Sequence, residues 1–305
     1  MSEKAFGSPH LAEVVPLSKL GRATRLGKIR VDPTLLTGLV LLGLVIVVAI
    51  TAPLLTPYDP IEQRFTEAFM PPFSPGHILG TDNFGRDIWS RIAFSTRLDL
   101  QIGLLSVSFP FVFGSLIGIA TGYLGGTLDT ILMRIVDVLM AFPFLILVIA
   151  IMSILGPGLT NLYIAVGVVG WIPYARITRG ETLATRHLEY VLAARTIGCS
   201  SARIMLRHIL PNVIAPALIY VFTGMVLAIL TGATLSFLGL GPQPPTPEWG
   251  AMIAEGRQYL LLAWWMTTLP GLALLVVGVA LSLIGDGLAE RRGGCRRPRS
   301  LRPRT

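Results

Sequence analysis

The sequence has little charge and almost no cysteine. Of its 305 residues only 14% are Asp, Glu, Lys or Arg, whereas 52% are hydrophobic. Soluble domains carry about a quarter charged residues, so this composition excludes an ordinary soluble fold and predicts an integral membrane protein. Two cysteines, Cys199 and Cys295, are too few for a disulfide framework.

The sequence also lacks the residue clusters that enzymes and metalloproteins use. It contains no GxxxxGK[ST] phosphate loop, so we expect the chain to bind neither ATP nor another cofactor. Its four histidines (His10, His77, His187 and His208) show no metal-ligand spacing, and we interpret the last two as loop residues. The formal charge of +8 does not indicate nucleic acid, because the basic residues border apolar runs and form no continuous face.

Long apolar runs recur at lengths that suit a bilayer. About 20 apolar residues cross a hydrocarbon core of about 30 Å. Six runs are candidates for transmembrane helices, and the fourth is the shortest; they cover residues 34–55, 100–123, 131–155, 159–175, 213–238 and 266–289. The polar stretch before the first run is too long for a signal peptide, so that run is expected to be a retained anchor. Arg134 and Asp137 lie three residues apart on one face of the third run and could pair.

Lysine and arginine are distributed unevenly between the connecting segments. With the N-terminus inside, segments 1–33, 176–211 and 289–305 carry six, six and seven of them, whereas segments 56–97 and 239–265 carry four and one. Because positive charge accumulates on the cytoplasmic side, both termini and the long loop between the fourth and fifth runs are expected in the cytoplasm.

These patterns predict an all-α membrane protein in five parts. The parts are a cytoplasmic tail (1–33), a first transmembrane helix (34–55), an external segment (56–97), a core with five transmembrane helices and the loop 179–211 (98–289), and a basic, disordered tail (290–305). Asp87 is expected to cap a helix that begins at Ile88. The prolines of segment 239–265 predict a stiff, partly extended chain, and its Trp249, Trp264 and Trp265 suit the headgroup zone.

Proline and glycine recur inside the expected spans. Five prolines (Pro110, Pro143, Pro173, Pro216 and Pro270) permit kinks. Gly114, Gly118 and Gly122 repeat every four residues, a spacing that allows two helices to approach closely. Ordinary glycine frequency in membrane helices explains the same repeat equally well.

The loop 179–211 is far longer than a simple connection requires. Its residues 188–197 predict a short helix, and Gly198 falls at the position after a helix end where a left-handed conformation is needed. Ser200 or Ser201 can begin a second short helix. The pattern therefore indicates a helix, a glycine turn and a helix at the membrane surface, an arrangement typical of a loop that docks a partner.

The second helix of this loop is expected to be amphipathic. Arg203 and Arg207 are four residues apart and share one face. Met205 and Ile209 lie roughly on the opposite face. Pro211 disfavours helical conformation at the residue before it, so a new helix is expected to start there.

The loop resembles the EAA loop of bacterial ABC-importer permeases. The residues that keep the spacing of that loop are Ala193, Ala194, Gly198, Leu210 and Pro211. Leu192 replaces the usual glutamate and His208 the usual isoleucine. With these two replacements the loop resembles that of the dipeptide and oligopeptide branch, in which the form AAR…G…RHILPN is common.

Two further motifs resemble the same branch. They are HILGTDNFGRDIWSR at residues 77–91 and SFLGLGPQPPTPEWG at residues 236–250. The similarity covers most of the chain from about residue 34 to 288. After Leu288 the sequence AERRGGC departs from the usual continuation of the branch.

The resemblance implies a type I ABC-importer permease fold in a bacterial inner membrane, with six transmembrane helices and a cytoplasmic coupling-helix loop. It implies a non-enzymatic subunit for import of dipeptides and oligopeptides. The implied partners are the bilayer, a second homologous permease, two cytoplasmic ATPases that hold ATP and Mg, and an extracytoplasmic substrate-binding protein. The implied coupling residues are Ala193, Ala194, Gly198, Arg203, Arg207, His208, Leu210 and Pro211.

Other functions remain open at this point. The same machinery could import nickel, glutathione or antimicrobial peptides. A proton-coupled carrier that needs no ATPase belongs to another class. The scarcity of ionisable residues in the spans argues against a carrier with its own proton relay.

Overall fold

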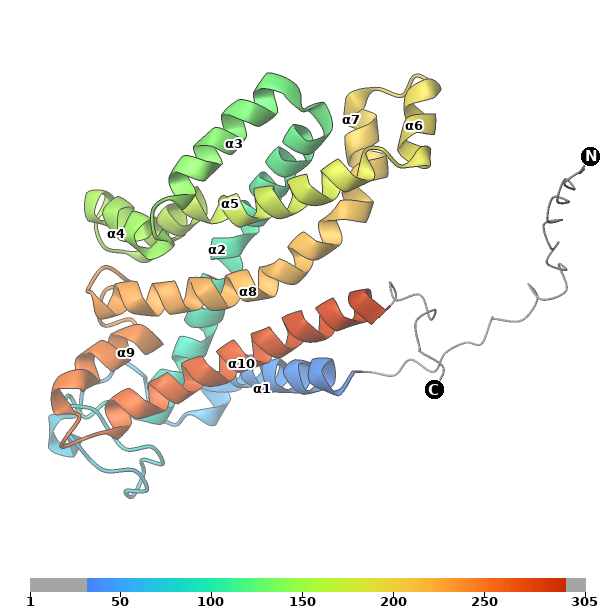
Figure 1. Ribbon diagram of the computed structural model, residues 1–305. Coiled ribbons are helices and arrows are strands. Elements are labelled where there is room, and N and C mark those ends of the chain that lie inside the picture. The colour runs from blue at the N-terminus through green and yellow to red at the C-terminus, as the bar shows by residue number, and fades with distance from the viewer. Residues whose placement is uncertain (1–31, 295–305) are drawn as a thin grey trace, which may run out of the picture. The chain divides into compact units, whose positions relative to one another are not determined.

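The computed structural model describes residues 32–294, and the regular elements of that range are helices (Figure 1). The long helices are α1 (Pro33–Leu55), α2 (Ile88–Leu124), α5 (Leu159–Thr185), α8 (Leu210–Phe237) and α10 (Trp265–Gly294). The shorter ones are α3 (Gly126–Met140), α4 (Phe144–Leu155), α6 (Glu189–Thr196), α7 (Ser201–Arg203) and α9 (Trp249–Gly256). Single 3₁₀ turns are η2 (Phe65–Glu67) and η4 (Arg257–Tyr259), and η3 (Ile204–Ile209) is a π-helical stretch.

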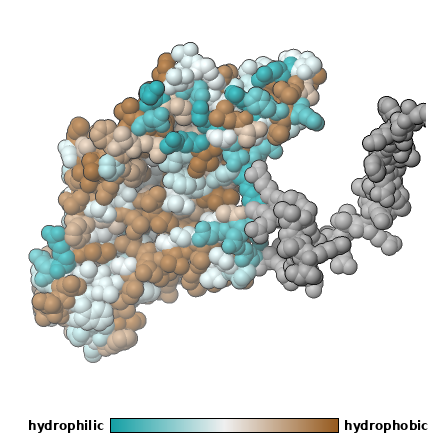
Figure 2. Space-filling model, viewed as in Figure 1, coloured by the Kyte–Doolittle hydropathy of each residue, from teal (hydrophilic) through white to brown (hydrophobic). Residues whose placement is uncertain are grey.

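Four helical runs are long and apolar enough to cross a membrane: α1, α2, the run Ser201–Phe237, and α10 as far as Arg292. The bent pair α3 and α4 makes a fifth if it is counted as one span. The predicted fourth span lies in α5, which has 27 residues but is not among these runs; every 18-residue stretch of α5 contains Arg176, which lowers its hydropathy. Figure 2 shows a hydrophobic surface over the long helices and more hydrophilic residues around α6 and α7.

The predicted third span, 131–155, is wrong as a single straight helix. Helices α3 and α4 meet at 88°. The break falls at Pro143, whose ring disfavours helical conformation at Phe142 and which has no amide hydrogen to donate. The polypeptide therefore turns sharply here, and α4 starts at the next residue.

The two aspartates of α3 have their partners on α5. The Asp137 carboxylate lies 3.9 Å from the guanidinium of Arg176, and both side chains are exposed. Asp137 therefore pairs with Arg176 and not with Arg134, the partner that the sequence suggested. Asp129 accepts two hydrogen bonds from the guanidinium of Arg179, at 2.6 and 2.7 Å. This bidentate pair fixes α3 beside α5.

The end of α10 differs from the prediction of a disordered tail from residue 290. The helix continues to Gly294, because Glu290, Arg291 and Arg292 are good helix formers and the two arginines face the negative end of the helix dipole. The remainder of that predicted tail, 295–305, lies outside the described residues, as do residues 1–31 of the predicted N-terminal tail.

The glycine repeat of α2 packs against α5. A Cβ atom on Gly114 would overlap the carbonyl of Trp171, and one on Gly118 would overlap the carbonyl of Ala175. A Cβ on Gly122 would stand 2.8 Å from the Cβ of Thr182. The close helix approach allowed by the sequence is therefore confirmed, and its partner is α5.

The α2–α5 contact gives a first test. Replacing Gly118 with Ala should lower the melting temperature in mild detergent, because overpacking of this kind costs about 1–3 kcal/mol. Gly180→Ala on α5 is the matched control, since a Cβ there meets no atom within 4 Å and Ala favours the helix by about 1 kcal/mol. A Gly118→Ala protein as stable as wild type would contradict this account of the packing.

Candidate functional site

The turn between α6 and α7 has the predicted conformation. Gly198 has a φ of +81°. The amide of Cys199 donates to the carbonyl of Ala194 at 3.1 Å, and the amide of Gly198 donates to that of Arg195 at 3.0 Å. These two bonds form a Schellman motif, which satisfies the last carbonyls of α6. A Cβ on Gly198 would meet no atom within 4 Å, so the conformation and not the packing requires glycine.

The helix after this turn does not stop at Pro211, contrary to the prediction. Ser200 stands at its N-cap position, and the run from Ser201 to Phe237 is continuous. Pro211 lies at the start of α8 but inside this continuous helix, where its missing amide hydrogen interrupts the hydrogen-bond pattern. The π-helical stretch comes just before it, and there the amide of Leu210 donates to the carbonyl of Met205, five residues back. The second helix of the loop and α8 therefore form one continuous helix.

One face of the loop is buried against the long helices. Its buried side chains are Val191, Ala194, Ile204 and Ile209, and they pack with Ile119 and Tyr123 of α2 and with Val213 of α8. Met205 joins them as a partly buried residue, so the predicted inner face of the second helix is confirmed. The guanidinium of Arg195 lies 5.4 Å from the ring centre of Tyr123. Apolar burial and this cation–π contact seat the loop on the end of α2.

The opposite face of the loop is open and mixed in character. Ile197 is 79% exposed and Leu206 is 55% exposed. Arg203 and Arg207 are exposed as well, and among the described residues neither takes part in an ion pair. Exposed apolar side chains together with arginine are the composition of a protein interface.

The eight predicted coupling residues fall into two groups. Ala194 is buried, and His208 and Leu210 are partly buried, so these three support the loop from inside. The exposed ones are Ala193, Gly198, Arg203, Arg207 and Pro211. The sequence analysis missed Ile197 and Leu206. Ile197 follows buried Ala194 by three residues, a spacing that predicts the buried face, but it is the C-cap of α6, where the chain leaves the helix.

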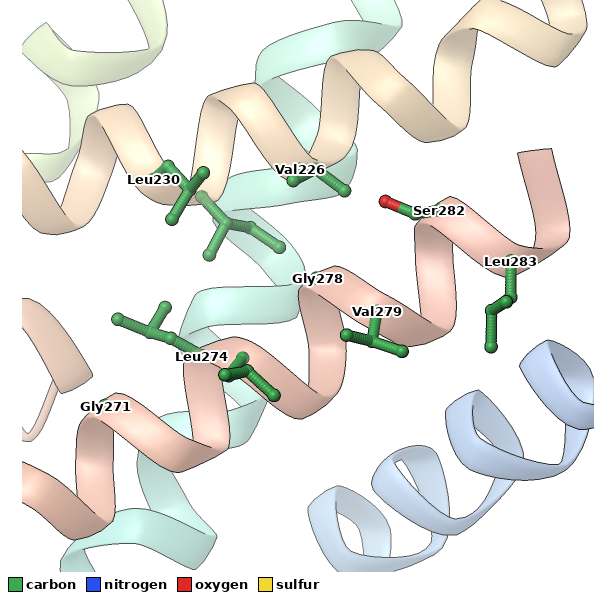
Figure 3. Close-up of a pocket in the computed structure, with 10 residues that line it drawn as sticks. Val226, Leu230, Gly271, Leu274, Gly278, Val279, Ser282 and Leu283 are labelled. Carbon is green, nitrogen blue, oxygen red and sulfur yellow. The ribbon is translucent and has the colours of Figure 1, made fainter. Parts of the chain in front are cut away.

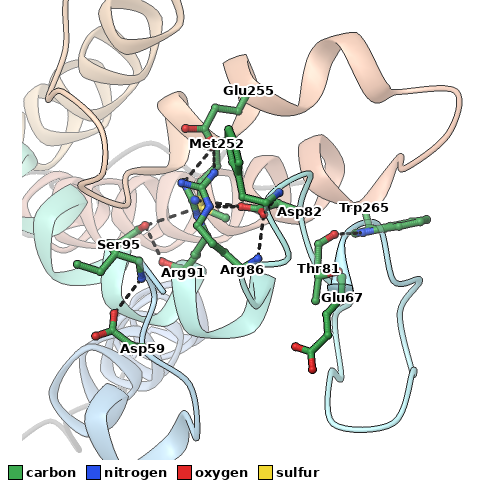
Figure 4. Close-up of polar contacts among 12 residues, drawn as sticks. Asp59, Glu67, Thr81, Asp82, Arg86, Arg91, Ser95, Met252, Glu255 and Trp265 are labelled. Atoms are coloured by element: carbon green, nitrogen blue, oxygen red, sulfur yellow. Dashed lines mark hydrogen bonds and ion pairs between the residues drawn. The ribbon is translucent and has the colours of Figure 1, made fainter. Parts of the chain in front are cut away.

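The opposite end of α2 carries a buried charge cluster (Figure 4). Arg91 of α2 donates to Asp82 at 3.0 Å and to Glu255 of α9 at 3.2 Å. Arg86 also donates to the carboxylates of Asp82 and Glu255, and its distance to Glu255 is 2.7 Å. The side chains of Asp82, Arg86 and Arg91 are at most 3% exposed. The cluster therefore fastens residues 56–87 to α2 and α9. The signal for it was the density of charged residues in GTDNFGRD, which holds Asp82, Arg86 and Asp87.

A buried histidine, His77, also holds the 56–87 segment through two carboxylates. His77 is 2% exposed, and its Nδ1 lies 2.8 Å from Asp87 while its Nε2 lies 3.3 Å from Glu67. The imidazole also stacks on Tyr58 with ring centres 4.7 Å apart. Asp87 accepts from the amide of Ser90 at 2.7 Å, so the predicted cap of α2 is confirmed.

Segment 239–265, which was predicted to be stiff and partly extended, also holds a helix. It contains α9, whose first amides, those of Gly250 and Ala251, donate to the Glu248 carboxylate. Trp249 is 1% exposed and donates to the carbonyl of Ile92 at 3.3 Å. The missed signal was apolar spacing in WGAMIAEG, where the first, fourth and eighth residues are buried.

Trp264 is 51% exposed, and its place at the headgroups stays a prediction. Trp249 and Trp265 are buried instead. Trp265 donates from Nε1 to the carbonyl of Thr81 at 3.0 Å (Figure 4). These two indole rings hold the 56–87 segment and α9 in place, and they are not available to lipid.

A groove of about 500 Å³ runs between α8 and α10 (Figure 3). Aliphatic side chains such as Leu230 and Leu274 line it together with Gly271 and Gly278, and Ser282 supplies its one polar side chain. The lining offers no pair of groups for acid–base chemistry. Within residues 32–294 no three His, Cys, Asp or Glu side chains are grouped as a metal site.

Comparison with known proteins places the sequence among transport permeases. The model of the binding-protein-dependent transport system inner membrane component matches residues 114–293, and that of the N-terminal TM domain of oligopeptide transport permease C matches residues 26–72. The dipeptide transport system permease protein of Haemophilus influenzae is 41% identical over 260 residues, which cover 84% of this chain and 88% of that one. The di/tripeptide transport system permease protein of Pseudomonas aeruginosa is 41% identical over 260 residues, 84% and 86% of the two chains.

A solved structure has a similar fold. It is an inward facing conformation of the MetNI methionine ABC transporter, with a TM-score of 0.52 over 67% of this chain and 96% of that chain. The sequence identity is 18%, so the similarity concerns the fold alone. That fold is the one found in ABC-importer permeases.

The charge cluster gives a second test. Glu255→Gln leaves two buried guanidinium groups with one carboxylate, and breaking a buried pair in this way costs about 3–5 kcal/mol. Glu62→Gln is the matched control, because Glu62 pairs with Arg64 while 52% exposed and such a pair contributes at most about 1 kcal/mol. Thermal unfolding in detergent should show a large loss only for Glu255→Gln; similar losses for both variants would refute the role of the cluster.

Proposed function

This chain belongs to the family of inner-membrane components of binding-protein-dependent transport systems, and from that premise we propose that it is the permease subunit of an ATP-driven importer of dipeptides and oligopeptides. It is a transport subunit and not an enzyme. Its similarity to dipeptide and di/tripeptide permeases over most of the chain supports peptide as the cargo. Nickel, glutathione and antimicrobial peptides are alternative cargoes for the same machinery.

The observation that carries the proposal is the continuity of α7, the π-helical stretch and α8. We propose that a cytoplasmic ATPase docks on the open face of the loop, at Ile197, Leu206, Arg203 and Arg207. Closure of two ATPases around ATP and Mg would then push the loop. Because the inner face of the loop is packed on α2 and continues into α8, the displacement would reach both long helices and open the path to the outside.

The proposed assembly contains a second homologous permease, two cytoplasmic ATPases and an extracytoplasmic substrate-binding protein in a bacterial inner membrane. The proposed topology has six spans, with α3 and α4 as one bent span and α5 as another. In support, 27 residues of helix are about 40 Å long, more than the hydrocarbon core. The excess of Lys and Arg in segments 1–33, 176–211 and 289–305 supports cytoplasmic termini.

Purification from native membranes tests this assembly. In mild detergent the chain should carry with it a second permease and two P-loop ATPases, which mass spectrometry would identify. Reconstituted vesicles should then take up peptide only when ATP is present inside. A chain that purifies alone and transports without ATP would instead establish a secondary carrier.

The glycine turn gives a sharper test of coupling. Gly198→Val should abolish peptide uptake while the amount of protein in the membrane stays normal, because a β-branched residue is strongly disfavoured at a φ of +81°. Gly198→Asn is the control, since Asn tolerates this conformation and the space around residue 198 is open. Uptake by whole cells, normalised to membrane protein, distinguishes them. Normal uptake by Gly198→Val would rule out coupling through this turn.

A further inference from the structure

Helix α8 has gaps in its hydrogen bonding where it leaves the loop. It begins directly after the π-helical stretch, and both Pro211 and Pro216 stand in its first two turns. Because a proline nitrogen carries no hydrogen, the carbonyl four residues before it loses its donor within the helix. For Pro216 that carbonyl belongs to Asn212. Sharp bends in helices concentrate at such gaps, so this length of helix is the one that yields most easily to a push.

The last turn of α10 supplies the donor that the Asn212 carbonyl lacks. The guanidinium of Arg292 donates to it from Nη2 at 3.4 Å. The Asn212 side chain meanwhile donates to the carbonyl of His208, one turn back, at 2.7 Å. The gap is therefore braced twice, within α8 by Asn212 and from the neighbouring helix by Arg292.

Arginine fills a second proline gap in the same manner. Pro53 lies inside α1, so the carbonyl of Ala49 has no donor in its own helix. Arg97 of α2 donates from Nε to that carbonyl and from Nη2 to the carbonyl of Ile50 at 2.9 Å. The rigid fork of N–H groups suits arginine to this use. The target of Arg292 differs in standing beside the loop.

The contact of Arg292 is the polar link between α8 and α10. Within residues 32–294 no other side-chain hydrogen bond joins these two helices. Much of the space between them is the groove of about 500 Å³, which aliphatic side chains and glycine line (Figure 3). Apolar contacts are not directional. The directional contact that fixes the end of α10 beside the first turns of α8 is therefore that of Arg292.

The far end of α10 holds the 56–87 segment and α9. Trp265, its first residue, donates to the carbonyl of Thr81 at 3.0 Å. Gly256 of α9 packs so closely on α10 that a Cβ atom there would stand 2.6 Å from the Thr267 hydroxyl. A helix of 30 residues is about 45 Å long, so α10 connects the start of α8 with the opposite end of the molecule.

We propose that Arg292 is a positioning residue for coupling, which makes α10 follow the first turns of α8 when an ATPase pushes the loop. The brace keeps α8 from bending at the gap that Pro216 leaves, and α10 carries the movement to the 56–87 segment and α9. This inference rests on the proposed function, which supplies the ATPases. Without the brace the ATPases still hydrolyse ATP, but part of the movement is lost in the bending of α8.

The test uses the complete importer in proteoliposomes with purified substrate-binding protein and ATP inside, and measures peptide uptake and ATP hydrolysis in the same vesicles. Arg292→Gln should lower the number of peptides imported per ATP hydrolysed about fivefold, the effect of losing one hydrogen bond. The rate of ATP hydrolysis and the melting temperature should stay near those of wild type. Arg292→Lys keeps a charged donor and should restore most of the ratio.

Arg291→Gln is the matched control. Arg291 is exposed, precedes Arg292 in the same turn, and has no hydrogen bond or ion pair among the described residues. Its variant loses the same charge, yet its ratio of peptide to ATP should equal that of wild type. Equal losses for the two variants would make the effect one of charge alone and would overturn the inference.

Pro216→Ala provides the sharpest comparison. Alanine restores the amide that the Asn212 carbonyl lacks, so in this background Arg292→Gln should lower the ratio by at most about twofold. An unchanged ratio for Arg292→Gln alone, or an equal fall with and without Pro216→Ala, would overturn the positioning role. A wild-type importer that takes up peptide without hydrolysing ATP would overturn the proposed function instead, so the two failures are distinguishable.

Discussion

The close contact between α2 and α5 is the constraint on which the rest of the structure depends. Between two helices in lipid the hydrophobic effect contributes little, so association relies on dispersion and on backbones that approach closely. Gly114, Gly118 and Gly122 permit that approach along the second half of α2. Once α5 is fixed there, Arg179 can hold Asp129 of α3, and the chain after α5 can return over the end of α2.

Helix α2 then connects the two ends of the molecule. Its 37 residues form a helix about 55 Å long. One end carries Asp87 and Arg91, which organise the 56–87 segment and α9 through buried charges. The other end carries Ile119 and Tyr123, which seat the loop between α5 and α8 through apolar contacts. The same element therefore organises both ends of the structure, one through buried charges and the other through apolar contacts.

The sequence predicted best the features that depend on local chemistry. The left-handed Gly198, the Asp87 cap and the amphipathic second helix each follow from a few neighbouring residues, and all three are observed. Features set by distant contacts were missed. Nothing near Trp249 shows that Ile92 will accept its indole hydrogen, and nothing near Pro143 gives an angle of 88°. In the proposed coupling site, the sequence named the loop correctly as helix–turn–helix, but the split into supporting and exposed residues required the packing against α2.

The π-helical stretch at Ile204–Ile209 has a consequence for how such a protein tolerates change in length. A π turn is equivalent to one residue inserted into an α-helix. Deleting a single residue there would restore the ordinary register and swing everything before it by about 100° around the axis of α8. Arg203 would then leave the open face while the membrane part of α8 stayed unchanged. The one extra residue of the π turn thus sets the orientation of the loop relative to α8.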